Sequence, residues 1–240
     1  SSQPRDLLRN SIGEGFEFKT LASENTETVR EIVDRHMKYN EWLDFGIDLL
    51  LGVRFDVKAD ADTRMFLPEE LMIEFDSTIF NGQAIVSDSR ILLQGREQII
   101  PKIIDPTLLF WSILGLVLMF QIFFSTASFR KVLAFTFLIF TGIIGWILTF
   151  MWVGTDHYMT KWNYNLLWAM PIYFPLAVFF FKAEKFKFIQ LLIKTCRVIL
   201  ISLLVFWWVN PQQFHSAIIP IILLIIWSLS VFLPFPKANK

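Results

Sequence analysis

The sequence is poor in the side chains that most catalytic and metal-binding sites use. It contains a single cysteine, Cys196, so no disulfide can form within the chain. It has only three histidines, His36, His157 and His215, and a zinc site is therefore not expected. The motifs of serine hydrolases, phosphate-binding loops, Cys-x-x-Cys pairs and His-Glu-x-x-His zinc enzymes are all missing. The sequence thus predicts neither a metal nor another cofactor.

Acidic residues are nearly absent from the second part of the chain. Residues 107–240 contain 10 Lys and Arg but only 2 Asp and Glu, whereas residues 1–106 contain 12 and 20. The acidic first region has no basic patch, so no nucleic-acid partner is expected. The first residues also lack the apolar run of a signal peptide. If residues 1–106 lie outside the cytoplasm, we expect an upstream segment that is missing or has been removed.

Long apolar runs dominate residues 107–240. The runs 107–124 and 132–153 carry no charge and have the length of about 20 residues that crosses a bilayer. Three further apolar runs, at 166–181, 189–209 and 216–234, bring the expected number of spans to five. Pro171 and Pro175 predict that the third run is kinked or unwound at its outer end. We therefore expect a bundle of about five transmembrane helices.

Basic residues gather in alternate loops of this bundle. The loop between the first two spans, the loop between the third and fourth, and the C-terminal tail contain Arg130, Lys131, Lys182, Lys185, Lys187, Lys237 and Lys240. The other two loops contain only Lys161. Because basic loops stay in the cytoplasm, the C-terminus is predicted to be cytoplasmic and residues 1–106 extracytoplasmic. Lys194 and Arg197, inside the fourth span, are interpreted as snorkelling to the cytoplasmic surface.

Residues 1–106 predict a small α+β region. Helices are expected at 4–12, at about 25–39 and from Pro68 to Phe75, with a weak strand at 15–20. An Asn81-Gly82 turn predicts a hairpin that continues into 84–86 and 91–93. His36 falls on the buried face of the second helix, which favours a core histidine over a catalytic one. Asp44, Asp48 and Asp56 interrupt an apolar run, and capping or turn formation is favoured over a ligand site.

The loop from Thr155 to Pro171 is the strongest candidate for function. It places an acid, an imidazole, two amides and two indoles at the predicted outer membrane edge, far more than a reversal of the chain needs. Asp156-His157 suggests acid–base chemistry, and Asn163 and Asn165 suggest binding of a carbonyl, a headgroup or a partner's backbone. Most tryptophans also fall near the outer span ends, which suggests either a lipid-binding cleft or simple anchoring.

Several blocks, in order along residues 4–171, resemble the Lnb-type lipoprotein N-acyltransferase family. They include Arg5 to Leu8, Trp42 to Asp48, Leu51-Gly52, Asp56, Lys58, Met65 to Leu71, Thr155 to His157 and Trp162 to Pro171. The resemblance implies part of a papain-like periplasmic domain joined to helices of the bacterial inner membrane. It also implies positioning or substrate-binding roles for Asp48, Asp56, Lys58, Asp156, His157, Asn163, Asn165 and Trp168.

The resemblance implies a reaction as well. A cysteine of the periplasmic domain takes an acyl chain from a phospholipid as a thioester and passes it to the amino group at a lipoprotein N-terminus. The family's nucleophilic cysteine and active-site histidine lie upstream of the position of Ser1, so neither falls within this sequence. The expected partners are phospholipid, a lipoprotein N-terminus, membrane lipids and a separate or missing N-terminal catalytic segment.

The sequence leaves open how the chain relates to such an enzyme and whether it is one at all. It is a fragment of the enzyme, a subunit completed by another polypeptide or an inactive remnant. The alternative from a different class is a non-catalytic membrane scaffold that docks an extracytoplasmic partner. A transporter is disfavoured because no acidic residue lies within a span.

Overall fold

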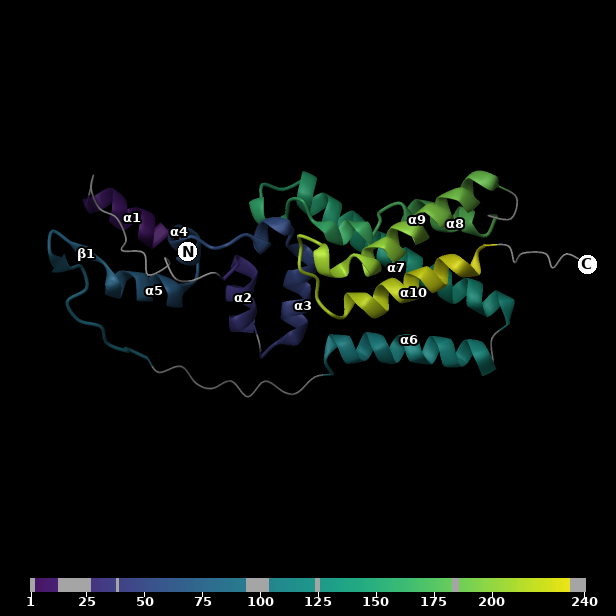
Figure 1. Ribbon diagram of the computed structural model, residues 1–240, viewed down its shortest axis with the longest axis horizontal. Coiled ribbons are helices and arrows are strands. Elements are labelled where there is room, and N and C mark those ends of the chain that lie inside the picture. The colour runs from purple at the N-terminus through teal and green to yellow at the C-terminus, as the bar shows by residue number, and fades with distance from the viewer. Residues whose placement is uncertain are drawn as a thin grey trace, which may run out of the picture. The chain divides into compact units, whose positions relative to one another are not determined.

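The computed structural model describes residues 3–12, 27–37, 39–93, 104–123, 126–182 and 186–233 (Figure 1). By its internal contacts the chain divides into two compact units. The first unit comprises Ser1–Tyr39 and Phe55–Pro101, and the membrane unit comprises Asn40–Arg54 and Lys102–Lys240. The segment Asn40–Arg54 thus packs with the apolar helices, although composition places it in the acidic region 1–106.

The first unit consists of short helices and one hairpin. Its elements are α1 (Gln3–Ile12), α2 (Val29–Met37), α4 (Ala61–Arg64), α5 (Pro68–Ser77), β1 (Ile79–Phe80) and β2 (Gln83–Ala84). The three predicted helices are confirmed, and Pro68 occupies the first turn of α5. Asn81 and Gly82 join the strands with φ angles of 52° and 79°, which fits the two-residue turn that this pair predicts.

Two strand predictions have other outcomes. The prediction of a strand at 91–93 is wrong, because these residues form no strand and Ile91, Leu92 and Leu93 are at least 82% exposed. Without a partner that covers them, three consecutive apolar side chains do not establish a strand. The predicted strand at 15–20 lies outside the described residues.

Ion pairs hold the first unit together around a small apolar cluster. Arg30 is buried and binds Asp56 at 2.7 Å, while Arg64 binds Glu70 at 2.8 Å. The apolar cluster centres on Met65. Burial raises the pKa of the Glu74 carboxyl, whose Oε2 has no hydrogen-bond partner among the described residues. The described part of the unit thus combines buried or half-buried ion pairs with a small set of buried apolar side chains.

His36 makes hydrogen bonds with both ring nitrogens. Its Nδ1 lies 2.7 Å from the carbonyl oxygen of Ile32, and its Nε2 lies 3.0 Å from Glu69 Oε2. The side chain is 23% exposed, so the histidine lies at the edge of the core. This agrees with the interpretation of His36 as a hydrogen-bonded structural residue.

The membrane unit is a bundle of apolar helices. It contains α6 (Pro106–Phe123), α7 (Ala127–Val153), α8 (Tyr173–Phe180), α9 (Lys187–Val205) and α10 (Ile218–Val231). Among the described residues, α6, α7 and α9 are long and apolar enough to cross a membrane, and α10 is a shorter apolar helix. A small strand pair followed by a membrane helix bundle confirms the predicted fold class.

The third predicted span is not a continuous helix. The run 166–181 begins in the 3-10 turn η4 (Tyr164–Leu167), passes through an irregular stretch around Pro171 and becomes helical only in α8. Pro171 disfavours a helical conformation of the residue before it, which explains why α8 begins only after Pro171, whereas Pro175 lies in the first turn of α8, where a helix tolerates proline. The unwound end that these prolines predict is confirmed, whereas a helix over the whole run is not formed.

Two glycines of α7 let this irregular stretch pack closely against the bundle. A Cβ at Gly145 would lie 2.2 Å from the carbonyl oxygen of Ala169, and one at Gly142 would lie 2.4 Å from the backbone nitrogen of Phe174. Both distances are far below van der Waals contact. Only glycine therefore permits this approach of two backbones inside the bundle.

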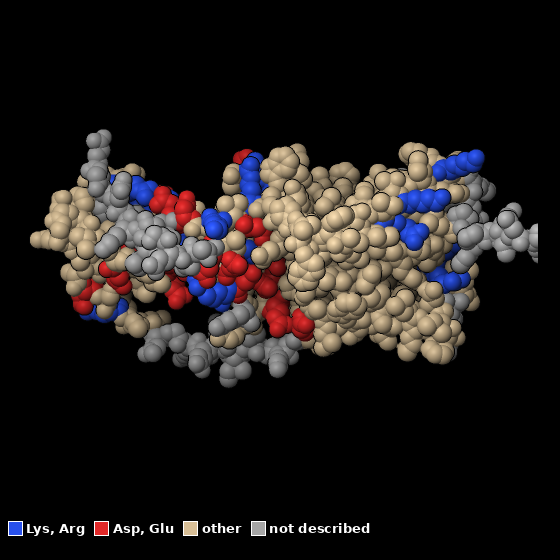
Figure 2. All heavy atoms as spheres, in the orientation of Figure 1, with Lys and Arg blue, Asp and Glu red and all other residues tan. Residues whose placement is uncertain are grey.

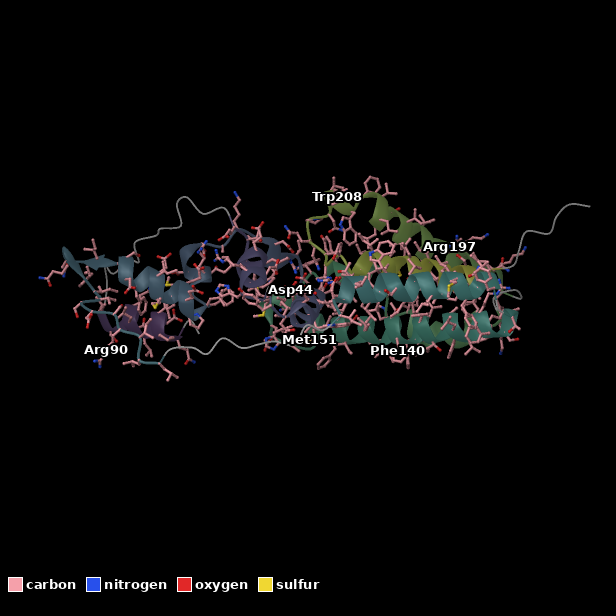
Figure 3. The ribbon with its side chains drawn as sticks, turned by 90° about the horizontal axis from the view of Figure 1, so that it is seen from below. Asp44, Arg90, Phe140, Met151, Arg197 and Trp208 are labelled. Atoms are coloured by element: carbon pink, nitrogen blue, oxygen red, sulfur yellow. The ribbon has the colours of Figure 1, made fainter. Side chains whose placement is uncertain are left out.

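Charged residues occupy the two ends of the membrane unit, and its middle is uncharged (Figure 2). Its described acids lie in and beside α3 (Glu41–Leu50), just before α6 and in the 155–170 loop, and they are Glu41, Asp44, Asp48, Asp105 and Asp156. The opposite end carries Arg130, Lys131, Lys182, Lys187, Lys194 and Arg197. Figure 3 places Asp44, Met151 and Trp208 toward one end and Arg197 toward the other. We call these the α3 end and the basic end.

Candidate functional site

The candidate site is the α3 end of the membrane unit, where α3 packs against two loops. α3 begins at Glu41 after Asn40, whose side chain accepts a hydrogen bond from the backbone nitrogen of Leu43 at 3.1 Å. Phe45 and Leu49, four residues apart on one face, pack against the large apolar core of the bundle. The helix therefore belongs to the bundle by packing as well as by its hydrogen bonds.

Amide side chains of the 155–170 loop cap the C-terminal end of α3. The Nδ2 of Asn165 donates to the carbonyl oxygens of Asp48 and Leu49 at 3.0 and 3.1 Å. The Nδ2 of Asn163 donates to those of Leu49 and Leu50 at 2.8 and 3.1 Å. The last carbonyls of a helix have no partner within the helix, so these bonds replace the water that would otherwise solvate them.

Gln212, from the loop before α10, extends this cap by one residue. Its Nε2 donates to the carbonyl oxygen of Leu51 at 3.2 Å and to Asn163 Oδ1 at 3.3 Å. Its Oε1 accepts from the backbone nitrogen of Tyr164 at 2.7 Å. Three amides thus satisfy four successive carbonyls, and we call Asn163, Asn165 and Gln212 the amide clamp.

The amide clamp is itself fixed by buried partners. The indole nitrogen of Trp168 donates to Asn165 Oδ1 at 2.8 Å, and the backbone nitrogen of Asn165 donates to Asn163 Oδ1 at 2.9 Å. Asn165 and Trp168 are 0% and 1% exposed. Because buried amides are costly unless they are paired, this closed network fixes one geometry for the end of α3.

The chain after α3 pairs with the same loop through its backbone. The nitrogen of Gly52 donates to the carbonyl oxygen of Met159 at 2.9 Å, and that of Val53 donates to the carbonyl oxygen of Trp162 at 3.2 Å. A Cβ at Gly52 would lie 2.2 Å from the carbonyl oxygen of Lys161. Glycine is therefore required at position 52 for the two segments to meet.

A second set of contacts holds the first turns of α3. The indole nitrogen of Trp42 donates to the carbonyl oxygen of Ile104 at 2.8 Å. Nε2 of His215 lies 3.9 Å from Asp44 Oδ2, and Nδ1 of His215 accepts from the backbone nitrogen of Ala217 at 3.1 Å. Since Nδ1 is an acceptor, the neutral ring carries its proton on Nε2, which faces Asp44.

The structure places the predicted loop residues in two different environments. Asn163, Asn165 and Trp168 are buried in the network around the end of α3. Asp156 and His157 are exposed, and their side chains contact no described polar partner. The described hydrogen bonds of His157 involve its backbone. For example, its carbonyl oxygen accepts from Thr160 Oγ1 at 2.8 Å.

The predicted residues outside the loop are not gathered at one place. Asp48 is buried in α3, and its carbonyl oxygen is bound by Asn165. Asp56 belongs to the first unit, where it pairs with Arg30. Lys58, also in the first unit, is exposed and forms a backbone bridge with Thr28. The sequence favours capping or turn formation for Asp56, and the structure shows an ion pair with Arg30 instead.

An open apolar groove of about 450 Å³ runs along the half of α7 nearer the α3 end. Its lining is entirely apolar and consists of Ile143, Trp146, Ile147, Phe150 and Phe174. The four α7 residues follow the spacing of one helical face. Because these residues lie within a helix of membrane-spanning length, hydrocarbon chains are the medium that meets them.

Sequence reasoning missed Gln212, Gly52 and Arg54 as parts of the candidate site. Gln212 lies about 50 residues from Asn163 in sequence, and its only signal is a polar pair in a short loop. Gly52 lies in one of the blocks that resemble the family, but its role depends on a contact with Lys161. The guanidinium carbon of Arg54 lies 3.8 Å from the centre of the Tyr158 ring, a contact that no local pattern predicts.

Comparison with known proteins identifies the membrane unit. The profile of the Lnb transmembrane domain matches residues 96–235, which is more than half of the chain. No curated protein and no solved structure matches. The match covers all five apolar helices of the bundle, the 155–170 loop and Gln212. The chain belongs to the Lnb family and contains its transmembrane domain.

Proposed function

We propose that this chain is the membrane module of an enzyme that N-acylates bacterial lipoproteins with a phospholipid as the acyl donor. The observation that carries the proposal is the match of residues 96–235 to the Lnb transmembrane domain. In the proposed reaction a cysteine thiolate attacks an ester of the phospholipid, forms a thioester and releases a lysophospholipid. The lipoprotein amine then attacks the thioester, forms the amide and releases the thiol.

The nucleophile of this reaction is not Cys196. That side chain is buried in α9 among the apolar core residues of the bundle. In the proposal the thiol and its histidine come from the upstream catalytic segment, and the first unit supplies the rest of a papain-like domain. The membrane unit binds the lipid substrates and provides a fixed attachment for that domain.

The clamp residues and the exposed loop residues have separate tasks in this proposal. Asn163, Asn165 and Trp168 hold the C-terminal end of α3. The segment Asn40–Arg54, which contains α3, is connected in sequence to the first unit on both sides. Asp156 and His157 are exposed and carry no competing side-chain contact, so they are free to meet a lipid headgroup or the lipoprotein N-terminus. The clamp thereby acts as a positioning element.

The membrane orientation that we propose follows from the charged ends of the bundle. The basic end faces the cytoplasm and the α3 end faces the periplasm, because lysine and arginine are retained on the cytoplasmic side. The apolar groove on α7 then lies in the outer leaflet, within reach of an acyl chain of the donor phospholipid. In this proposal the module lies in the bacterial inner membrane, and its C-terminus lies in the cytoplasm.

The test of this function is mass spectrometry of lipoproteins from a host that lacks lipoprotein N-acylation and expresses the complete protein. We expect a third acyl chain on the N-terminal cysteine of its lipoproteins. Absence of that chain, with the protein present in the membrane, would contradict the proposal.

A matched pair of variants tests the role of the groove. Phe150 lines the groove and is 64% exposed, whereas Phe140 lies on the same helix outside the groove and is 63% exposed. We expect Phe150→Ala to reduce N-acylation about tenfold, since removal of a large apolar contact weakens lipid binding by about 1–2 kcal/mol. Phe140→Ala should leave it unchanged. Equal effects of the two variants would remove the groove from the proposed function.

A further inference from the structure

Two basic residues lie on adjoining segments at the α3 end of the membrane unit, where acidic residues otherwise prevail. Arg54 follows α3, and Lys161 belongs to the 155–170 loop. The backbone bonds from Gly52 to Met159 and from Val53 to Trp162 bring these two segments side by side. The same close approach that requires glycine at position 52 therefore brings the segment that carries Arg54 next to the segment that carries Lys161.

Neither basic group has a carboxylate partner within the described part of the chain. Arg54 instead stacks on Tyr158, with its guanidinium carbon 3.8 Å from the ring centre. This differs from Arg30, Arg35 and Arg64 of the first unit, each of which forms an ion pair. Asp156 lies on the same loop but forms no ion pair with Arg54 or Lys161. Among the described residues, no carboxylate therefore pairs with either of these two positive charges.

The stacked arrangement suits an anion with several oxygen atoms. A guanidinium whose carbon lies over a ring makes a cation–π contact that uses none of its N–H donors as hydrogen bonds, and those donors match the geometry of a phosphate. Lysine adds a mobile point charge beside it. The ring also holds Arg54 in place before any ligand binds, which lowers the entropic cost of binding.

The neighbouring aromatic residues place this pair at a membrane surface. Tyr158 is 60% exposed and Trp162 is 52% exposed, and such residues are typical of the membrane–water interface. Trp162 has a φ of 58°, a conformation that is strained for a bulky residue and that concentrates at functional sites. Its ring packs against Trp152 of α7 at a centroid distance of 5.3 Å, which ties this loop to the end of a spanning helix.

We propose that Arg54 and Lys161, with Tyr158 and Trp162 beside them, form a binding site for the phosphate group of a membrane phospholipid. The inference rests on the proposed function, because the lipid that this site binds is the phospholipid that donates the acyl chain. Its test does not rest on that function, since lipid binding is measured without turnover.

The experiment is native mass spectrometry of the full chain, purified in detergent and titrated with phosphatidylglycerol. We expect Arg54→Gln to weaken phosphatidylglycerol binding about tenfold, as loss of a charge-assisted hydrogen bond predicts. Arg54→Lys should recover part of the loss. The control is Arg130→Gln at the basic end, which should bind as the unsubstituted protein does.

Three results would overturn the inference. The first is unchanged binding in Arg54→Gln with an unchanged melting temperature, and the second is an equal loss in Arg130→Gln. The third is displacement of the lipid by millimolar inorganic phosphate, which would identify a site for free phosphate. If binding follows the prediction but lipoproteins gain no third acyl chain, the proposed function fails and the lipid site stands. If the acyl chain is added but Arg54→Gln binds normally, the lipid site fails alone.

Discussion

The two halves of the 155–170 loop both carry polar and aromatic side chains, but these side chains lie in different environments. Asp156, His157 and Trp162 in the first half are exposed, and Trp162 is 52% accessible. Asn163 and Asn165 in the second half are 2% and 0% accessible and bind the backbone of a distant helix. The buried polar residues of this loop therefore bind protein backbone, whereas the exposed ones make no such side-chain contact with described residues.

The difference indicates how this family member divides its tasks. The buried half fixes α3 on the bundle through closed hydrogen bonds, so its residues act on position. The exposed half keeps its acid and its imidazole without side-chain partners among the described residues, and in the proposed function these two groups meet the substrate. Substitutions in the two halves should consequently change different measured quantities.

The largest effect is expected for Asn165→Ala. The substitution removes a donor from the carbonyls of Asp48 and Leu49 and leaves the buried indole N–H of Trp168 unpaired. At about 1–3 kcal/mol for each buried group left unsatisfied, the free energy of unfolding of the membrane unit should fall by about 3–5 kcal/mol. Thermal unfolding in detergent measures it. A melting temperature equal to that of the unsubstituted protein would contradict the claim that the buried half of the loop stabilises the membrane unit.

A somewhat smaller effect is expected for Gly52→Ala. The added Cβ would meet the carbonyl oxygen of Lys161 at 2.2 Å, so the two segments must separate, at a cost of about 1–3 kcal/mol. The matched control is Gly46→Ala in the middle of α3, where nothing lies within 4 Å of the added atom. This control should be neutral or stabilise the helix by about 0.5–1 kcal/mol. Similar melting temperatures for both variants would show that the close approach at Gly52 contributes nothing.

The smallest effect on stability is expected for His157→Ala. The side chain is exposed and has no described polar partner, so the free energy of unfolding should change by less than about 0.5 kcal/mol. Lipoprotein N-acylation by the complete protein should nevertheless fall if the exposed half meets the substrate. The two readouts are a melting curve and lipoprotein mass spectrometry. A destabilised variant would place His157 with the buried half, and one with full activity would remove His157 from the proposed contact with the substrate.

Much of the membrane unit follows from the sequence because the period and length of apolar runs depend on local composition. The ends of α6, α7 and α9 lie close to the predicted spans, and Pro171 correctly indicates an unwound stretch. The failure of 91–93 to form a strand has the opposite cause. Strand formation depends on a partner, and no pattern within three residues specifies one.

The sequence indicates where in the chain the candidate site lies, but not which distant residues its side chains bind. Asn163, Asn165 and Trp168 stand out as polar and aromatic residues at a span end, and a backbone ligand was one of the expected uses of the amides. The segment that they bind, 48–50, is more than 110 residues away and carries no sequence signal for the contact. Gln212 was missed for the same reason, because a long-range hydrogen bond leaves no trace in local periodicity.

The most direct test of the amide clamp is hydrogen–deuterium exchange over residues 41–53 in the full chain, compared with Asn165→Ala and His157→Ala. In the unsubstituted protein these amides should exchange as slowly as those at the adjoining end of α7. Asn165→Ala should accelerate exchange in this segment by at least tenfold, whereas His157→Ala should not change it. Exchange over 41–53 that is fast in the unsubstituted protein, or that is equal in all three, would contradict the account.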